Sequence, residues 1–193
     1  MSALSDQIDF ILELDALKHI ERRSYITGGE RRENSAEHTW HLAIVSWSMA
    51  RAFKLDISEE KLLKLALVHD LGEIDAGDTF LYSSNRGNAH EAERACVDRL
   101  QSHSGNDIDD LAELWEEQEQ GISLEAKFLK VIDRILPFLL NVQSEGKTWI
   151  ELGVRRSQVE KAHVFIADEF PPIHAWIKSK IYLAVASGWL IDE

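Results

Sequence analysis

Apolar residues recur at the spacing of an amphipathic helix along almost the whole chain, and no stretch shows the sustained alternation typical of a β-strand. Clusters of glycine, serine and asparagine separate the periodic segments, which indicates helices joined by short loops. The predicted fold class is therefore all-α, a bundle of helices. The expected helices cover residues 4–20, 35–53, 59–71, 88–103, 107–119, 123–145, 156–168 and 173–187.

Polar residues mark several helix ends. Asn34 with Glu37 three residues later is the pattern of a capping box, and Ser58 precedes a second apolar segment. Gly72 is expected to end that second helix. The polar stretch 74–87 is expected to be a loop. Three of the tryptophans, Trp40, Trp47 and Trp115, fall on amphipathic segments and are expected in the core.

Length and composition indicate one folded domain over residues 1–193. Hydrophobic residues make up 45% of the chain, enough to form a core, and there is no repeat, linker or low-complexity tract. The only cysteine, Cys96, excludes an internal disulfide and favours a reducing compartment. No secretory leader and no apolar run of about 18 residues is seen, so we expect a cytoplasmic protein without a membrane span.

The net charge of −13 argues against general nucleic-acid binding, because such proteins need a positive surface for the phosphates. It does not exclude a small phosphate ester, since a metal ion and a few arginines can reverse the local field. We therefore expect a small-molecule partner and no nucleic acid.

Two acidic residues stand within apolar helical stretches, where burying a carboxylate is costly unless a cation or hydrogen bonds compensate. Asp70 follows the apolar run 65–68 and His69, and Asp133 lies between two pairs of aliphatic residues. A further histidine, His38, lies early in the helix expected after Asn34. Two carboxylates and two imidazoles most simply share a metal ion. The predicted ligands are His38, His69, Asp70 and Asp133.

The chemistry of this ligand set narrows the choice of ion. Two neutral imidazoles and two carboxylates balance a divalent charge and leave two positions open on an octahedral ion. Mn, Co, Fe or Ni suit such a set better than structural Zn does, with Mg as the alternative. Open positions accept water and substrate, so the predicted site is catalytic.

The order of these residues and their surroundings resemble the HD superfamily of metal-dependent phosphohydrolases, whose pattern is H…HD…D. Within it, the chain is similar to the 5′-deoxynucleotidase-like group, over roughly residues 5–145. The stretches that carry the resemblance are 32–38, 69–78, 114–117 and 133–134. The resemblance implies a helical bundle around one divalent ion and hydrolysis of nucleoside 5′-monophosphates to nucleoside and phosphate.

The resemblance also implies roles for further residues. Glu73 and Asp78 match acids beside the metal-bound water and the sugar, where one could transfer the proton of the nucleophile or leaving group. If the helix persisted past His69, Glu73 would share its face. Arg23 matches a contact to phosphate or sugar. Glu117 matches a substrate-side acid once a gap of one residue is allowed.

One departure concerns the sugar. In the deoxynucleotidases a tryptophan follows the arginine and shapes a pocket that refuses a 2′-hydroxyl, whereas here Ser24 follows Arg23. Selectivity for deoxyribose is therefore expected to be weaker.

Two other functions stay open at this point: an HD phosphodiesterase or triphosphohydrolase acting on other nucleotides, and a metal-binding module without turnover. A homodimer is also expected, because the chain has many apolar helix faces and ends in the apolar segment 186–191.

Overall fold

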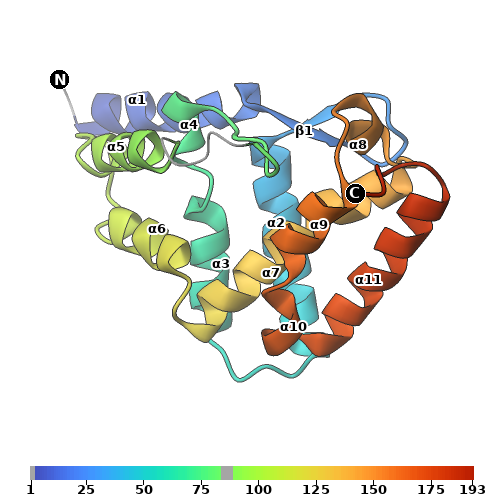
Figure 1. Cartoon of the computed structure of the whole chain (residues 1–193). Helices are drawn as coiled ribbons and strands as arrows, with labels where there is room; N and C mark the ends of the chain where they lie inside the picture. The colour runs from blue at the N-terminus through green and yellow to red at the C-terminus, as the bar shows by residue number, and fades with distance from the viewer. Residues whose placement is uncertain (1–2, 84–88) are drawn as a thin grey trace. The chain divides into compact units, whose positions relative to one another are not determined.

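A computed structural model of the chain describes residues 3–83 and 89–193, and it is built almost entirely of helices (Figure 1). The all-α prediction is confirmed, with the addition of one small two-stranded sheet formed by β1 and β2. The elements in chain order are α1 (Ala3–Asp15), the 3₁₀-helix η1 (Ala16–His19), β1 (Glu21–Tyr25), β2 (Arg32–Asn34), α2 (Ser35–Ala52), α3 (Glu59–Val68), α4 (Glu73–Ala76), α5 (Ala89–Gln101), α6 (Leu111–Gln120), α7 (Leu124–Gln143), α8 (Lys147–Glu151), α9 (Arg156–His163), α10 (Ile166–Glu169) and α11 (Pro171–Ala186).

The chain divides into two compact units. The first comprises Met1–Glu21, Asn34–Thr79 and Asn85–Ile132, and the second comprises Arg22–Glu33, Phe80–Ser84 and Asp133–Glu193. The division falls inside the uninterrupted helix α7, between Ile132 and Asp133. The single domain over residues 1–193 stays a prediction.

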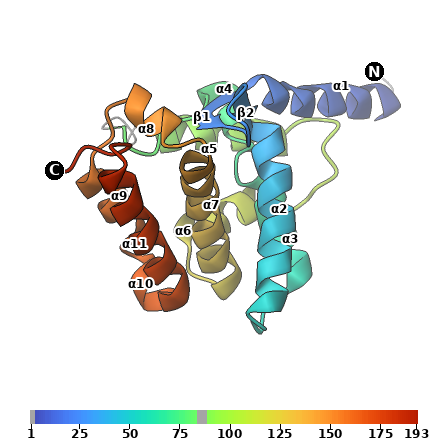
Figure 2. The ribbon, with the colours of Figure 1, turned by 90° about the vertical axis from the view of Figure 1, so that its right-hand side faces the viewer.

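In the first unit, α3 packs between α2 and α6, and α5 packs against both α4 and α6 (Figures 1 and 2). The leucines at helical spacing fill its interior: Leu42 of α2, Leu62 and Leu65 of α3, and Leu100 of α5 are all fully buried. These positions form the apolar stripes that the periodicity predicted. Leu42 and Leu65 each lie one helical turn from a candidate ligand, His38 and His69.

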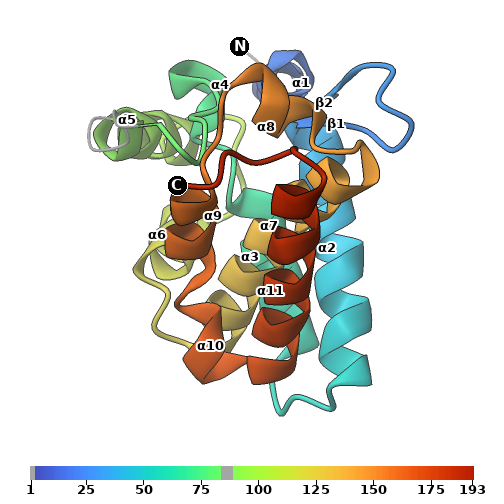
Figure 3. The same ribbon diagram turned by 45° about the vertical axis from the view of Figure 1, so that its right-hand side comes forward.

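In the second unit, α11 packs against α9 and α10 (Figure 3), and the ring of Phe138 contacts the rings of Trp149, His163 and Trp176. The C-terminal segment packs on this same unit. The amide of Ile191 donates to the carbonyl of Val154, Leu190 is buried, and an added Cβ on Gly146 would come within 2.3 Å of the Cβ of Trp189.

The caps predicted from sequence are confirmed, but several helix bounds differ. Asn34 and Glu37 form the capping box of α2, and Ser58 accepts from the amide of Lys61 at the start of α3. The helix expected over 4–20 is α1 followed by η1, and the one expected over 156–168 is divided into α9 and α10. Helices α4 and α8 and the two strands were not predicted, because segments of three to five residues show no measurable period. Of the predicted loop 74–87, residues 74–76 belong to α4 and residues 84–87 lie outside the described residues.

Two further expectations were wrong. Gly72 does not end the second helix: α3 already ends at Val68, and Gly72, with a φ of −61°, directly precedes α4. Trp115 is buried as predicted, but 66% of Trp40 and 38% of Trp47 are exposed on the outer face of α2. Within the described residues, no helix combines the length and the apolar character that crossing a membrane requires.

Candidate metal centre

The corner between α3 and α4 carries three of the predicted site residues. Helix α3 ends at Val68, and His69, Asp70, Leu71 and Gly72 turn the chain into α4, which begins at Glu73. The turn is held by backbone hydrogen bonds from Leu71 to Val68 and from Glu73 to Asp70. The α3 helix therefore does not persist to Glu73; a tighter turn brings Glu73 to the same corner.

Hydrogen bonding fixes the form of the His69 ring. Its Nδ1 lies 2.7 Å from the carbonyl oxygen of Ala66, which can only accept, so Nδ1 carries a proton and the neutral form of the ring presents its lone pair at Nε2. Nε2 is buried, has no hydrogen-bond partner within the described residues, and lies 3.0 Å from Oδ2 of Asp70. An imidazole lone pair facing a carboxylate oxygen is unfavourable unless a cation or a proton lies between them. This arrangement fits a metal ligand whose second nitrogen is oriented by a backbone carbonyl.

Trp115 of α6 holds the same corner from the other side. Its indole Nε1 donates to the carbonyl oxygen of His69 over 3.2 Å, and the side chain is only 1% exposed. This bond could not be predicted from the sequence, because a tryptophan at position 115 fits an apolar helix stripe equally well.

His38 lies one turn into α2 and is fully buried, with its ring centroid 5.4 Å from that of His69. Asp133 follows Ile132 within α7. Its Oδ2 accepts a hydrogen bond from Nη1 of Arg134 over 3.0 Å. One ligand atom each of His38, His69 and Asp133 can be chosen so that all three atoms lie within 4.8 Å of one another. Such a group of two nitrogens and an oxygen could hold a metal ion.

Glu73 lies at the same corner and is only 7% exposed. Its Oε2 accepts a hydrogen bond of 2.5 Å from the hydroxyl of Ser35, the first residue of α2. Sequence reasoning did not identify Ser35, since a serine at a helix start is usually explained by capping. Asp78 lies shortly after α4 and is partly buried.

The two predicted substrate contacts lie in different surroundings. Arg23, in β1, is exposed, and within the described residues its guanidinium forms no hydrogen bond or ion pair; its carbonyl accepts from Thr148 over 2.8 Å. Glu117, in α6, contacts Lys61 Nζ at 2.5 Å and Ser123 Oγ at 2.6 Å. Burial raises the pKa of Glu117, but these two partners outweigh that effect and hold its pKa below the usual value.

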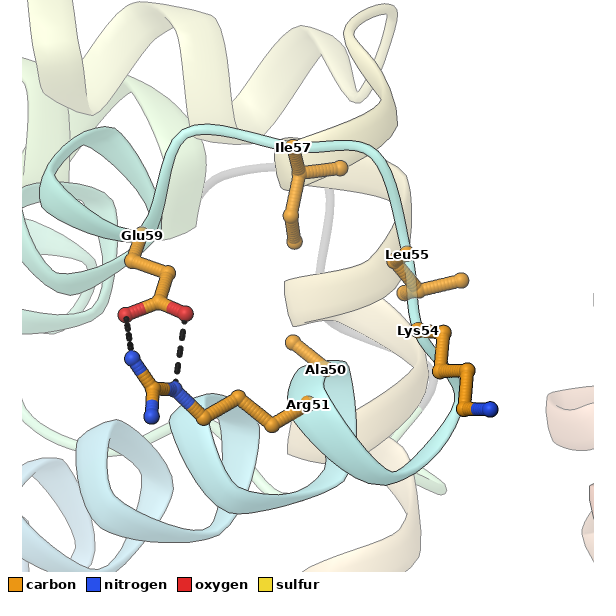
Figure 4. Close-up of a pocket in the computed structure, with 6 residues that line it drawn as sticks. All are labelled: Ala50, Arg51, Lys54, Leu55, Ile57 and Glu59. Atoms are coloured by element: carbon orange, nitrogen blue, oxygen red, sulfur yellow. Dashed lines mark hydrogen bonds and ion pairs between the residues drawn. The ribbon is translucent and has the colours of Figure 1, made fainter.

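A separate hollow of about 330 Å³ lies at the far end of α2. Figure 4 shows its lining, with Arg51 and Glu59 joined by two hydrogen bonds across it. Arg51 follows His38 by thirteen positions, which is about 20 Å along a helix. The hollow is therefore not part of the candidate metal centre.

The sequence profile of the HD domain family matches residues 14–174, most of the chain. The chain belongs to the HD domain family. A solved structure similar to this HD domain, a predicted metal-dependent phosphohydrolase from Magnetospirillum magnetotacticum MS-1, shares 33% sequence identity with a TM-score of 0.86, covering 98% of this chain and 96% of that one.

Two curated relatives of this HD domain are 5′-deoxynucleotidases. Human HDDC2 is 29% identical over 131 residues, which cover 66% of this chain and 62% of the human protein. The match thus spans about three fifths of the length of that relative. YfbR of Salmonella arizonae is 28% identical over 188 residues, covering 87% of this chain and 93% of that protein.

Proposed function

We propose that this HD domain is a metal-dependent phosphohydrolase that converts nucleoside 5′-monophosphates to nucleoside and phosphate. The observation that carries the proposal is the buried His69 Nε2, oriented by its own Nδ1–H bond and grouped with His38 and Asp133. The two 5′-deoxynucleotidase relatives support the choice of substrate class.

The proposed ligands are His38, His69, Asp70 and Asp133. The first two supply imidazole nitrogens, and Asp70 supplies an oxygen 3.0 Å from His69 Nε2. This mixed nitrogen and oxygen set favours Mn, Co, Fe or Ni, with Mg as the alternative, over a structural Zn site. When bound there, a divalent ion acidifies water and withdraws electron density from a phosphoryl group.

The protein's own side chains supply the remaining chemistry. Glu73 is the proposed group that moves the proton of the attacking water, because it is buried at the ligand corner and is itself no ligand. Asp78 is proposed to deliver a proton to the departing sugar oxygen. Arg23, whose guanidinium is exposed, is proposed to contact the phosphate, for which its planar geometry is suited. Glu117 is proposed as a substrate-side acid, held in place by Lys61 and Ser123.

The experiment is phosphate release from a panel of nucleotides, measured with Mn or Co added to the metal-free protein. We expect release from nucleoside 5′-monophosphates. Turnover only of cyclic nucleotides or nucleoside triphosphates would contradict the proposed substrate and favour a phosphodiesterase or triphosphohydrolase. Metal binding without any turnover would indicate a non-catalytic module.

We also propose a homodimer. The C-terminal segment that suggested it packs on its own unit, so the support now comes from α2. Trp40, Ile44 and Trp47 are 66%, 46% and 38% exposed, and residues 38–50 contain no acidic, lysine or arginine side chain. Two copies with a charge of −13 each repel one another least where they meet over a segment without charged side chains of its own, at the end of which Trp47 Nε1 donates to the Arg51-paired carboxylate of Glu59. For the compartment we propose the cytoplasm, in which the buried thiol of Cys96 stays reduced.

A further inference from the structure

The hydrogen bond between Ser35 and Glu73 joins two residues that are 38 positions apart in the chain. Ser35 opens α2, which carries His38 one turn later, and Glu73 opens α4, directly after the corner with His69 and Asp70. The bond therefore connects the first turn of one ligand-bearing helix to the corner that bears two other ligands.

Ser35 is not needed to cap its helix. The cap of α2 is already complete, because the Asn34 side chain accepts from the Glu37 amide and the Glu37 side chain accepts from the Asn34 amide. The Ser35 hydroxyl nevertheless lies in a fully buried position and donates to a carboxylate that is 7% exposed. A buried hydroxyl without a capping role requires another explanation.

The length of the bond provides one. At 2.5 Å, it has the length of an O–H···O bond to an ionised carboxylate, which is about twice as strong as a bond between neutral groups. It also restricts the carboxylate to one rotamer, since Oε2 must stay within reach of a hydroxyl fixed on α2.

We propose that Ser35 is a positioning residue for proton transfer by Glu73. It holds Oε2 so that the carboxylate keeps the orientation in which it accepts a proton from water. The inference rests on the proposed hydrolase function, and it adds a residue for which neither the ligand pattern nor the resemblance gave a role.

The test compares Ser35→Ala with Ser46→Ala. Ser46 lies on the same helix, is also fully buried, and its hydroxyl has no hydrogen-bond partner within the described residues. It therefore controls for the loss of a buried hydroxyl alone. With a nucleoside monophosphate and Mn, we expect Ser35→Ala to lower kcat by about tenfold, part of the 10² or more that acid–base catalysis contributes. KM and the bound metal should stay unchanged, and Ser46→Ala should keep the original kcat.

A double-mutant cycle shows whether Ser35 acts through Glu73. Adding Ser35→Ala to Glu73→Gln should leave kcat unchanged, because the carboxylate that Ser35 holds is already lost. The same cycle on the metal-free protein, followed by thermal unfolding, needs no activity. There the Tm losses of the two single variants, each on the order of several degrees, should not add.

The outcomes separate this inference from the function on which it rests. If the unmutated protein hydrolyses no nucleotide, the proposed function fails and the positioning role falls with it. If that protein is active but Ser35→Ala keeps its kcat, or its loss adds fully to that of Glu73→Gln, the positioning role alone is overturned.

Discussion

At the scale of single residues, the sequence points to the proposed ligands but not to the groups that contact them. Asp70 and Asp133 stand out because carboxylates in apolar helical stretches need a partner. The hydrogen bond from His69 Nδ1 to the carbonyl of Ala66 is local, because it spans three residues at the end of one helix. The contacts from Ser35 and Trp115 span 38 and 46 residues and depend on tertiary packing, which no local pattern records.

Asp133→Ala should abolish stoichiometric metal binding, because the group keeps its two imidazoles but loses an anionic oxygen. We expect well below one metal per chain after dialysis, measured by elemental analysis, together with loss of turnover. Asp109→Ala, which removes an exposed carboxylate, is the control and should keep its metal. Full metal content in Asp133→Ala would remove this residue from the ligand set.

Ser24 should leave the enzyme with modest discrimination between deoxyribose and ribose. Shape alone rejects an added hydroxyl by about 10²-fold at best, and a serine is smaller than the tryptophan of the deoxynucleotidase-like group. We expect kcat/KM for dAMP to exceed that for AMP by less than this factor, and Ser24→Trp to widen the ratio. Since Ser24 is only 6% exposed, thermal unfolding must first show that the variant folds. Equal ratios in both proteins would mean that Ser24 does not line the sugar pocket.

At the scale of elements, helix starts were predictable and short elements were not. Asn34 and Ser58 were recognised because capping is a local hydrogen-bond pattern. Helix α8 has five residues, and β1 and β2 form a hairpin whose side chains meet α8: Tyr25 Oη donates to Glu151 Oε1 over 2.9 Å, and Arg32 pairs with the same carboxylate. These elements depend on contacts more than a hundred residues apart, which periodicity does not reveal.

Gly72→Ala should separate α4 from α5. An added Cβ would lie 2.6 Å from the Cβ of Glu93 and 2.8 Å from its backbone, so α5 or the ligand corner must move. Overpacking of this kind costs about 1–3 kcal/mol, which corresponds to roughly 2–12 °C in Tm for a chain of this size. We expect this loss together with weaker metal binding, measured by thermal unfolding and metal titration. An unchanged Tm would show that α5 yields without cost.

His163 should make the protein less stable in acid. Burial lowers its pKa below the usual 6.5, helped by the charges of Arg134 and His174, so the folded state holds this ring neutral while the unfolded state takes up a proton. The stability that the neutral His163 ring contributes is fully present above pH about 6.5 and is lost as the pH falls below that value. Urea unfolding between pH 7 and 5 should show a smaller loss of stability for His163→Gln than for the unmutated protein. Equal losses would contradict the assignment.

At the scale of the whole molecule, composition indicated an acidic, folded chain without an internal disulfide. The helical fold class was predicted from the periodicity of the apolar residues. The two compact units were not anticipated, because no linker or change of composition marks them: their boundary lies inside α7. The outward position of Trp40 and Trp47 was also missed, since a stripe at helical spacing does not show whether its partner is the chain's own core or another molecule.

The homodimer can be tested through that face of α2. Sedimentation velocity at micromolar concentration should give twice the chain mass of 22.0 kDa. Trp40→Glu should shift the population to monomer, because it places a charge on an uncharged contact. Tyr182→Glu is the control: this residue is 60% exposed on α11 and outside the proposed face. A monomeric unmutated protein would contradict the proposal.

The bond from the Trp115 indole to the His69 carbonyl bears on which replacements the position tolerates. Judged by size and burial alone, replacing Trp115 with phenylalanine or leucine would be expected to keep the core apolar. Neither side chain has an N–H, so either replacement removes a hydrogen-bond donor from the backbone carbonyl of His69, a proposed ligand. Position 115 is therefore constrained by hydrogen bonding as well as by volume, and screens that score it for hydrophobicity alone will overestimate the range of residues it accepts.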